Sequence, residues 1–393
     1  MRVAVVGAGV VGVCSAFELT LQGHEVEVFE RHSSAAEGAS FASPGLLIPG
    51  WASPGLAMHG RRMAAGFALR NLSWVYQART ARRGAEQTLA DTQVRSLTVS
   101  SLKRLQEIEN KYELDYEASH GALVLLHHPK EVVRAGLYAA DLAQAGVDCG
   151  VLDEAQTRAA TPALHPELKV HGSLFYPQAR SGHVRLFSQQ MRAHAQRLGA
   201  RFHFKSEVTG LGAGSKPLVR LQHGSNPAAF DAVLICAGAQ TQKLLAPLGQ
   251  HLALQTFSSY SLTVPQRKQD SEQDTDGPSQ AIWDASKHIS YTPLGHRLRV
   301  SGGLELGDFG PSIHEALRDR LYKHIGECFP RATPTGQEQL WKGQYCASFN
   351  GAPIIGPSGQ AGIWLNVGHG MQSWALACGS ALVMADMLAK PTP

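Results

Sequence analysis

Two glycine clusters near opposite ends of the 393-residue chain have the spacing of cofactor-binding turns. The first, Gly7-Ala8-Gly9-Val10-Val11-Gly12, fits the pattern G-x-G-x-x-G. In such a turn the first glycine permits a tight bend, the second lets a pyrophosphate reach the backbone, and the third lets the next helix pack closely. Glu30 could accept hydrogen bonds from ribose hydroxyls, and its charge disfavours the 2′-phosphate of NADP. The motif therefore predicts a bound dinucleotide, either FAD or NAD.

The second cluster is Gly368-His369-Gly370-Met371-Gln372, between a predicted strand and a small-residue-rich helix over 373–388. A helix N-terminus offers free amides and the positive end of the helix dipole. Such an end would stabilise the negative charge that a reduced flavin accumulates near N1. A third, weaker signal is the apolar run 231–237, which ends at Gly238 and would let backbone approach a cofactor.

The elements that must position these residues follow from the periodicity. An apolar run over 2–7 predicts a buried strand, 10–22 a helix ending before Gly23, and the alternation over 25–30 a second strand, together a β-α-β unit. Further helices are predicted at 87–111, 130–145, 185–198 and 313–325, and strands at 121–127, 172–176, 201–205, 218–222, 231–237, 253–264, 289–291 and 297–301. The polar stretch 266–280 predicts a solvated hairpin tip.

Composition excludes several classes of protein. The net charge of +4 is too small for a dedicated nucleic-acid binder, which carries a denser basic stripe. Six widely spaced cysteines without a C-x-x-C pair predict reduced thiols and a cytoplasmic protein. His127-His128 and His203 lack metal-ligand spacing, so no metal is expected. The run from Val3 to Phe17 is broken by glycines and does not predict an export signal, and no apolar run is long enough to span a bilayer.

Taken together, the motifs resemble the FAD-dependent D-amino-acid oxidase superfamily, and most of all its bacterial D-amino-acid dehydrogenase (small subunit) branch. The matching stretches are 1–31, Ala39-Ser40 and Gly45, 260–263, 297–300, 341–356 and 362–388. The resemblance implies an α/β fold, with a Rossmann-like FAD-binding domain (1–86, 184–250 and 341–393) and a β-rich α+β substrate-binding domain (87–183 and 251–340). It also implies oxidative deamination of a D-amino acid or related amine, by hydride transfer from the Cα–H to flavin N5.

Carried over by position, the resemblance implies which residues contact a non-covalent FAD. They are Gly7, Gly9, Val11 and Gly12 at the pyrophosphate, Glu30 at the ribose, Arg31 and Ser40 beside the phosphates, Val208 at the adenine, Gly238 near the pyrophosphate, and Gly368, His369, Gly370, Met371 and Gln372 around the pyrimidine end of the flavin. Cys346 does not match the position at which some relatives attach flavin covalently.

The chain departs from the family pattern in two places. The family's Gly-Leu-Arg-Pro strand, whose Arg clamps the substrate carboxylate, reads Gly343-Gln344-Tyr345-Cys346 here, and Asn350 replaces an acidic residue. A phenol binds a carboxylate more weakly than a guanidinium does. The second departure is Ser43-Pro44-Gly45-Leu46, where the dehydrogenase branch has an Asn–small–Gly–Gln pattern near the flavin.

Another cation could replace the missing arginine. The candidates are Arg180, Arg185, Arg297 and Arg299. Arg297 and Arg299 share one face of their strand, and we expect that face to be solvated. Tyr345 and Tyr260 are predicted as substrate-facing hydroxyls, and His369 as the residue at the flavin's pyrimidine edge.

Residues 38–85 contain no Asp or Glu, and their basic residues alternate with aromatic and apolar ones. This pattern predicts peripheral contact with an anionic membrane surface, which suits a dehydrogenase that passes electrons to a membrane quinone. A loop covering the cofactor followed by a basic helix explains the same composition. Three functional alternatives also stay open: a glycine or sarcosine-type oxidase using O₂, an NAD-dependent dehydrogenase, and a flavin-binding protein without amino-acid activity.

Overall fold

The computed structural model describes residues 1–51, 61–63, 76, 85–223, 226–266, 276–306, 312–332 and 336–389. Its first thirty residues form the predicted β-α-β unit: β1 (Arg2–Val6), α1 (Val10–Leu21) and β2 (Glu25–Phe29). The helix ends before Gly23, whose φ of +81° favours glycine.

The N-terminal sheet, as we call the sheet built on this unit, has the order β18-β19-β12-β1-β2-β8. Its other strands are β8 (Arg201–His203), β12 (Ala232–Ile235), β18 (Ile354–Pro357) and β19 (Ile363–Val367). Strands β19, β12, β1, β2 and β8 are parallel, and β18 is antiparallel. The three glycine-containing turns that follow β1, β12 and β19 therefore lie along one edge of the sheet.

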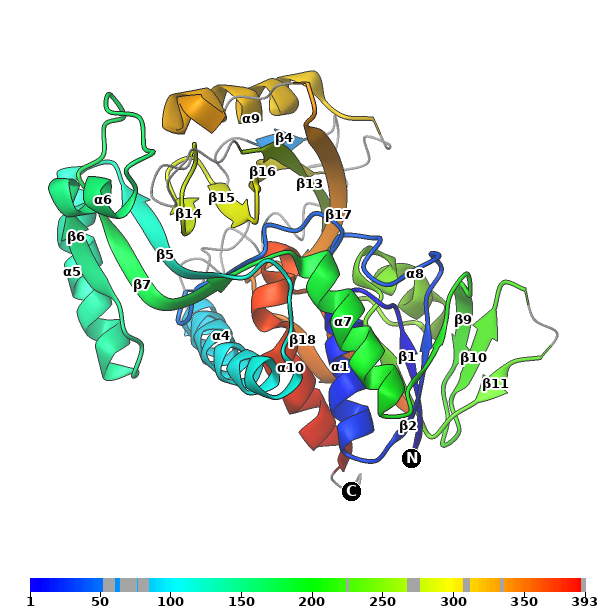
Figure 1. Cartoon of the computed structure of the whole chain (residues 1–393). Coiled ribbons are helices and arrows are strands. Elements are labelled where there is room, and N and C mark those ends of the chain that lie inside the picture. Colours follow the sequence, from blue (N-terminus) through cyan, green and yellow to red (C-terminus); the bar gives the residue numbers. More distant parts are fainter. Residues whose placement is uncertain are drawn as a thin grey trace.

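Each face of the N-terminal sheet is covered. On one face lie α1, α7 (Val184–Arg197) and α10 (Ser373–Ala389), side by side in Figure 1, and their apolar side chains form one core with β1 and β2. On the other face, β9 (Val208–Gly212), β10 (Leu218–Leu221) and β11 (Ala228–Ala229) form a small antiparallel sheet beside α8 (Thr241–Leu245). Short 3₁₀ turns η2 (Gly238–Gln240) and η3 (Ala246–Leu248) flank α8.

The large sheet, as we call the third sheet, has the order β17-β13-β16-β15-β14-β5-β7-β3, with β4 on β16 and β6 on β7. Its strands are β3 (Leu46–Leu47), β4 (Arg61–Met63), β5 (Ser119–Leu126), β6 (Gly150–Asp153), β7 (Gly172–Ser181), β13 (Leu254–Pro265), β14 (Ala281–Asp284), β15 (Ile289–Leu294), β16 (Arg297–Leu306) and β17 (Gln339–Ser348). Helix α9 (Glu315–Cys328) packs across one face, through Leu321 and Ile325 against Leu262 and Val300 (Figure 1). The 3₁₀ turn η4 (Pro330–Ala332) follows α9.

Two elements fall outside the predicted division into domains. Helix α4 (Ala85–Tyr112), expected with the substrate-binding part, packs on α10 so closely that a Cβ added to Gly379 would lie 2.6 Å from the Leu97 carbonyl oxygen. Strand β17, expected with the FAD-binding part, pairs with β13 in the large sheet. The remaining helices, α5 (Pro129–Gln144) and α6 (Glu154–Ala160), lie at the end of the large sheet formed by β5, β6 and β7, on the left in Figure 1.

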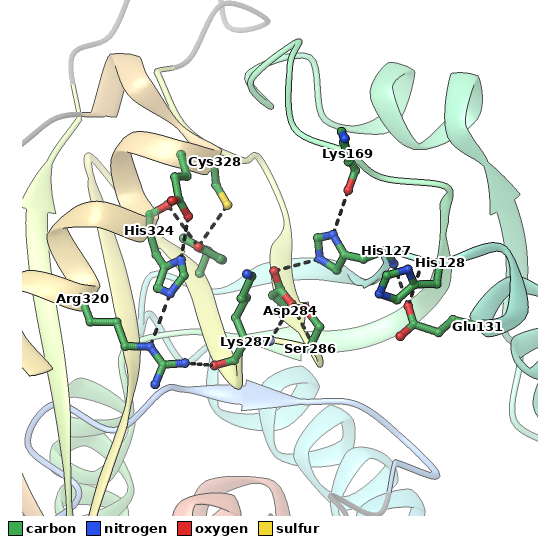
Figure 2. Close-up of polar contacts among 12 residues, drawn as sticks. His127, His128, Glu131, Lys169, Asp284, Ser286, Lys287, Arg320, His324 and Cys328 are labelled. Carbon is green, nitrogen blue, oxygen red and sulfur yellow. Dashed lines mark hydrogen bonds and ion pairs between the residues drawn. The ribbon is translucent and has the colours of Figure 1, made fainter. Parts of the chain in front are cut away.

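A histidine–aspartate pair joins β5 to the β14–β15 turn, as Figure 2 shows. His127 Nε2 lies 2.9 Å from Asp284 Oδ2, and its Nδ1 lies 2.9 Å from the Lys169 carbonyl oxygen. Both neighbours are acceptors, so the doubly protonated ring is the form that satisfies both. The hydrogen bond to Asp284 raises the pKa of His127 accordingly. Asp284 also accepts from the backbone N–H groups of Ser286 and Lys287 and so fixes the turn.

Two predicted features lie mainly outside the described residues. The first is the predicted hairpin tip at 266–280, of which residues 267–275 are not described. The second is the predicted membrane-contacting stretch 38–85, of which residues 52–60, 64–75 and 77–84 are not described. Among the helices that are described, none is both long and apolar enough to cross a bilayer.

Candidate functional site

The carboxyl ends of β1, β2 and β12 open onto a cavity of about 540 Å³. Six of the residues predicted to contact FAD line it: Gly7, Gly9, Glu30, Arg31, Val208 and Gly238. They come from four separate stretches of the chain, and the parallel register of the N-terminal sheet brings them together. The volume lies within the range of pockets that hold small molecules and cofactors.

The turn into α1 has the geometry that the glycine pattern predicts. A Cβ on Gly7 would lie 2.7 Å from the Cys236 carbonyl oxygen, and one on Gly12 would lie 1.9 Å from the Gly7 carbonyl oxygen. Gly9 has ordinary extended angles, and a Cβ there would meet only Ser40 Oγ, at 3.5 Å. Ser40 Oγ accepts the Val10 N–H at 3.1 Å. The glycines at 7 and 12 thus serve close packing, and Gly9 keeps space open at the cavity.

Glu30 is a buried carboxylate held in place at the cavity wall. Its Oε2 accepts the Ala8 N–H at 2.7 Å, and its Oε1 accepts the His32 N–H at 3.0 Å and lies 2.7 Å from the His32 ring. These contacts link β2 to the glycine turn and fix the carboxylate where a ribose could donate to it. Arg31 and Val208 lie in the same wall.

The C-terminal glycine cluster lies at the same edge of the N-terminal sheet but does not line this cavity. Gly368 and Gly370 adopt positive φ angles, and η5 (Gly370–Gln372) leads into α10. His369 pairs with Ala347 of β17 through the backbone. Its imidazole lies 3.1 Å from Ser380 Oγ, and burial lowers its pKa to about 3, so the ring is neutral.

The two neighbouring residues of this cluster face other parts of the site. Met371 packs against the apolar cluster that contains Tyr345, and Gln372 Nε2 donates to the Trp51 carbonyl oxygen at 3.3 Å. The cluster therefore joins the N-terminal sheet to β17.

The cavity also reaches the large sheet, because Trp341, Gly343 and Gln344 of β17 line it. The Trp341 ring stacks on Phe41 at 4.3 Å, and its buried Nε1–H has no acceptor among the described residues. An orphaned donor at the wall of a cavity is the kind of group that a bound cofactor would satisfy. The residues present therefore fit a dinucleotide that extends from the N-terminal sheet towards the large sheet.

Next to Trp341, the face of the large sheet opposite α9 carries two rows of buried polar side chains. The cross-strand register places Ser261, Ser301 and Ser290 in one row and Thr263, Arg299 and Thr292 in the next. Trp341 continues the first row. The three serine hydroxyls have no hydrogen-bond partner among the described residues. Sequence reasoning missed these rows, although the alternation of Ser259, Ser261 and Thr263 within an apolar strand is a signal that could have found them.

The prediction of a solvated face is wrong for Arg299. This side chain is 2% exposed, donates from Nε to Thr263 Oγ1 at 3.1 Å and from Nη1 to the Ser43 carbonyl oxygen at 3.3 Å. It makes no ion pair with a carboxylate in the described part of the chain. Burial and then the charge of Arg297 lower its pKa to about 10. Arg297 itself is partly exposed and pairs with Glu117 at 2.7 Å.

The two predicted substrate-facing tyrosines lie on opposite faces of the large sheet. Tyr345 shares the polar face with Trp341, stacks on Phe257 at 5.7 Å, and its hydroxyl forms no hydrogen bond within the described residues. Burial raises the pKa of Tyr345, and the charge of Arg299 opposes that rise. Tyr260 points the other way, into the core beneath α9, where its hydroxyl accepts the His314 N–H at 3.1 Å. We therefore do not retain Tyr260 in the site.

In chemical terms, the site combines a cavity that fits a dinucleotide with a buried polar wall that carries the Arg299 guanidinium. Among the described residues, no group of three or more His, Cys, Asp or Glu side chains could hold a metal ion.

The chain matches the FAD dependent oxidoreductase family (DAO) over residues 2–387. It is 31% identical over 411 residues to the D-amino acid dehydrogenase of Bradyrhizobium diazoefficiens, covering 100% of this chain and 96% of that protein. Among solved structures it resembles L-proline dehydrogenase from P. horikoshii (TM-score 0.77, 15% identity, 98% and 92% of the two chains). It also resembles glycine oxidase from Geobacillus kaustophilus (TM-score 0.75, 19% identity, 100% and 95%). These neighbours confirm the predicted α/β fold with a second domain.

Proposed function

The chain belongs to the family of FAD dependent oxidoreductases, and we propose that it catalyses the oxidative deamination of a D-amino acid or a related amine. The family decides between the two dinucleotides that the N-terminal motif left open, in favour of FAD. The D-amino acid dehydrogenase of B. diazoefficiens, similar over its full length, supports the substrate class.

The proposed reaction removes two electrons from the carbon that bears the amine. When bound, FAD supplies the acceptor, at flavin N5, for the hydride that leaves the substrate Cα–H. The amine nitrogen loses one proton, the product is an imine, and water hydrolyses the imine to an oxo acid and ammonia. With a neutral amine, this chemistry depends mainly on positioning and electrostatics rather than on a strong general base.

The residues of this chain have separate tasks. The backbone amides at the start of α1 would hold the pyrophosphate, with Gly238 near it. Glu30 would hold the ribose and Val208 the adenine. The C-terminal cluster of Gly368 to Gln372 would lie at the pyrimidine end of the flavin, with His369 as a neutral, buried group. We propose that FAD is held without a covalent bond.

The substrate would lie against the polar face of the large sheet. Tyr345 has a hydroxyl there that forms no hydrogen bond within the described residues, and the carbonyl oxygens of Ser43 and Pro44 bind Arg299 and Thr292 of the same face. In this arrangement the N-terminal sheet binds the cofactor and the large sheet binds the substrate.

One observation carries the proposal. The cavity that begins at Gly7, Gly9 and Glu30 ends at Trp341 and Gly343 of the large sheet, so one ligand can touch the glycine turn and the polar face together.

Anaerobic mixing of the purified holoenzyme with D-amino acids, their L-enantiomers, glycine and sarcosine tests this function. We expect a D-amino acid to bleach the yellow flavin absorbance and its L-enantiomer to leave it unchanged. If none of the compounds bleaches the flavin, the protein binds FAD without amino-acid activity and the proposal fails. A second arm, in air with no added acceptor, measures peroxide: we expect little, and rapid peroxide formation would identify an oxidase.

We also propose that the enzyme is cytoplasmic, touches the inner face of the cell membrane through residues 38–85 and passes electrons to a membrane quinone. The support is compositional, since this stretch has no acidic residue to oppose its six arginines. Sedimentation with vesicles at low salt is the test. We expect the protein to pellet with anionic vesicles and not with neutral ones, and failure to pellet with either would end this proposal.

A further inference from the structure

We propose that Arg299 binds the substrate carboxylate, in place of the arginine that the family carries at the position of Tyr345. This inference rests on the proposed function. It specifies the substrate further, as an amino acid whose only carboxylate is the one beside the reacting carbon. Three features of the site support this role for Arg299.

The first feature is the charge of Arg299, which no carboxylate balances within the described residues. A buried cation costs free energy unless an anion or several acceptors compensate it. Arg299 is 2% exposed, yet its two hydrogen bonds go to the neutral oxygens of Thr263 and Ser43. A guanidinium has five N–H donors, so three have no acceptor among the described residues. A carboxylate would provide both the missing charge and the missing acceptors, in the bidentate geometry that arginine favours.

The second feature is that both departures from the family pattern, Tyr345 and the Ser43–Leu46 segment, lie near Arg299. Its Nη1 donates to the carbonyl oxygen of Ser43, in the altered Ser43–Leu46 segment. Thr292, beside Arg299 on β15, donates from Oγ1 to the Pro44 carbonyl oxygen at 2.6 Å and fixes the same segment. Tyr345 stands where the family has its arginine, and the charge of Arg299 acts on it by opposing the rise of its pKa. The lost arginine and the altered segment are therefore explained together, by a cation that has moved to β16.

The third feature is the set of groups around the guanidinium. The neighbouring row of the sheet carries serine hydroxyls without partners among the described residues, on Ser261, Ser290 and Ser301, which can donate to a carboxylate but add no charge. Burial, and then the charges of Arg299 and Arg297, lower the pKa of His183 to about 4, so this ring is neutral at pH 7. Arg297, whose charge also acts on Arg299, is paired with Glu117, so Arg299 carries one positive charge without a carboxylate, which matches a monocarboxylate better than a dicarboxylate.

Two of the other candidate cations already have a carboxylate: Arg297 pairs with Glu117, and Arg180 lies 3.6 Å from Glu109. Arg185 lies over the Phe41 ring at 4.4 Å, and its buried Nε has no hydrogen-bond partner among the described residues. Arg297 is the best matched control, because it lies on the same strand and the same face two residues away and has its own carboxylate.

The test measures the binding of propionate, a carboxylate without an amine, to the FAD-loaded enzyme by calorimetry. The variants are Arg299→Met, Arg299→Lys and, as control, Arg297→Met. We expect Arg299→Met to weaken propionate binding roughly 10- to 150-fold, the value of charge-assisted hydrogen bonds, and Arg297→Met to leave it unchanged. Arg299→Lys keeps the charge but loses the fork, so we expect binding about tenfold weaker. Equal affinity in wild type and Arg299→Met, or no binding to wild type, overturns the proposal.

A stability measurement separates binding from a structural role. If Arg299 only held the Ser43 segment, Arg299→Met would lower the thermal midpoint, whereas removing an uncompensated buried charge should leave it unchanged or raise it. If Arg299→Met does not fold, the structural role is favoured and the propionate affinity of Arg299→Lys decides: affinity equal to wild type overturns the proposal. Propionate binding without flavin bleaching by any D-amino acid would refute the proposed function and leave the carboxylate site standing.

Discussion

Replacing Gly9 and Gly12 by alanine, one at a time, should separate cofactor binding from folding. Both glycines belong to the same turn, but their surroundings differ. A Cβ on Gly9 would meet only Ser40 Oγ, at the ordinary contact distance of 3.5 Å, and Gly9 has backbone angles that alanine adopts freely. A Cβ on Gly12 would lie 1.9 Å from the carbonyl oxygen of Gly7. The first change fills ligand space, and the second forces the helix away from the strand.

The expected magnitudes follow from these distances. Real Cβ contacts essentially never fall below 3.0 Å, so Gly12→Ala must move backbone by about 1.1 Å, the difference between the two distances. Overpacking costs about 1–3 kcal/mol where side chains can yield, and a backbone carbonyl cannot, so we expect a loss of at least about 3 kcal/mol. Gly9→Ala should leave the free energy of unfolding of the apoprotein nearly unchanged. It should weaken FAD binding by the value of one charge-assisted hydrogen bond, about 1.5–3 kcal/mol, or roughly 10- to 150-fold.

Two measurements on each variant check this reasoning. The thermal midpoint of the apoprotein reports folding, and titration of the apoprotein with FAD reports affinity. Gly136→Ala is the control, because Gly136 lies in α5 with no atom within 4 Å of an added Cβ. Alanine there should stabilise the helix by up to about 1 kcal/mol and leave FAD affinity unchanged.

If Gly9→Ala binds FAD as tightly as wild type, the glycine turn does not contact the cofactor and the proposed FAD site is wrong. If Gly12→Ala keeps the wild-type thermal midpoint, the close contact between α1 and the Gly7 turn does not contribute to stability as expected.

Three further predictions concern other parts of the site and fold. Tyr345→Phe should raise the KM for the substrate several-fold with FAD still bound, and Tyr260→Phe should leave KM unchanged; the reverse order would reject our placement of the two tyrosines. His127→Gln should lower the free energy of unfolding by about 3 kcal/mol at about pH 5.5. This cost should shrink at high pH, because the contribution of a histidine with a raised pKa is lost as pH rises through that pKa; a difference in thermal midpoint that grows with pH would contradict the charged pair with Asp284. Acid precipitation should release FAD into the supernatant, whereas yellow colour retained in the pellet would indicate a covalent attachment, with Cys346 the first residue to replace.

Local chemistry in the sequence was sufficient to predict the N-terminal glycine turn of the site. The spacing of Gly7, Gly9 and Gly12, the apolar strand before them and Glu30 after the next strand are all contained in a single β-α-β unit. Their geometry is set by interactions between residues close in the chain, so the sequence predicts it directly. The structure places Gly7, Gly9 and Glu30 around one cavity.

The substrate half depended on pairing between distant strands. Period-two alternation shows that Tyr260 and Ser261 face opposite sides of β13, but it does not show which side α9 covers. That choice placed Tyr260 in the core and Ser261 in the polar row. Likewise the sequence could not show that β17 pairs with β13, or that α4 packs on α10, because both contacts join segments far apart in the chain.

The glycine spacing, the strand and helix periodicity and the two departures from the family pattern are therefore properties that the sequence determined by itself. Only the tertiary structure decided that Arg299 is buried without a carboxylate, because its burial results from the Ser43 segment, β13 and β15 closing around it. Whether a charged side chain is solvated or confined depends on what the rest of the chain places over it, and no local pattern encodes that covering layer.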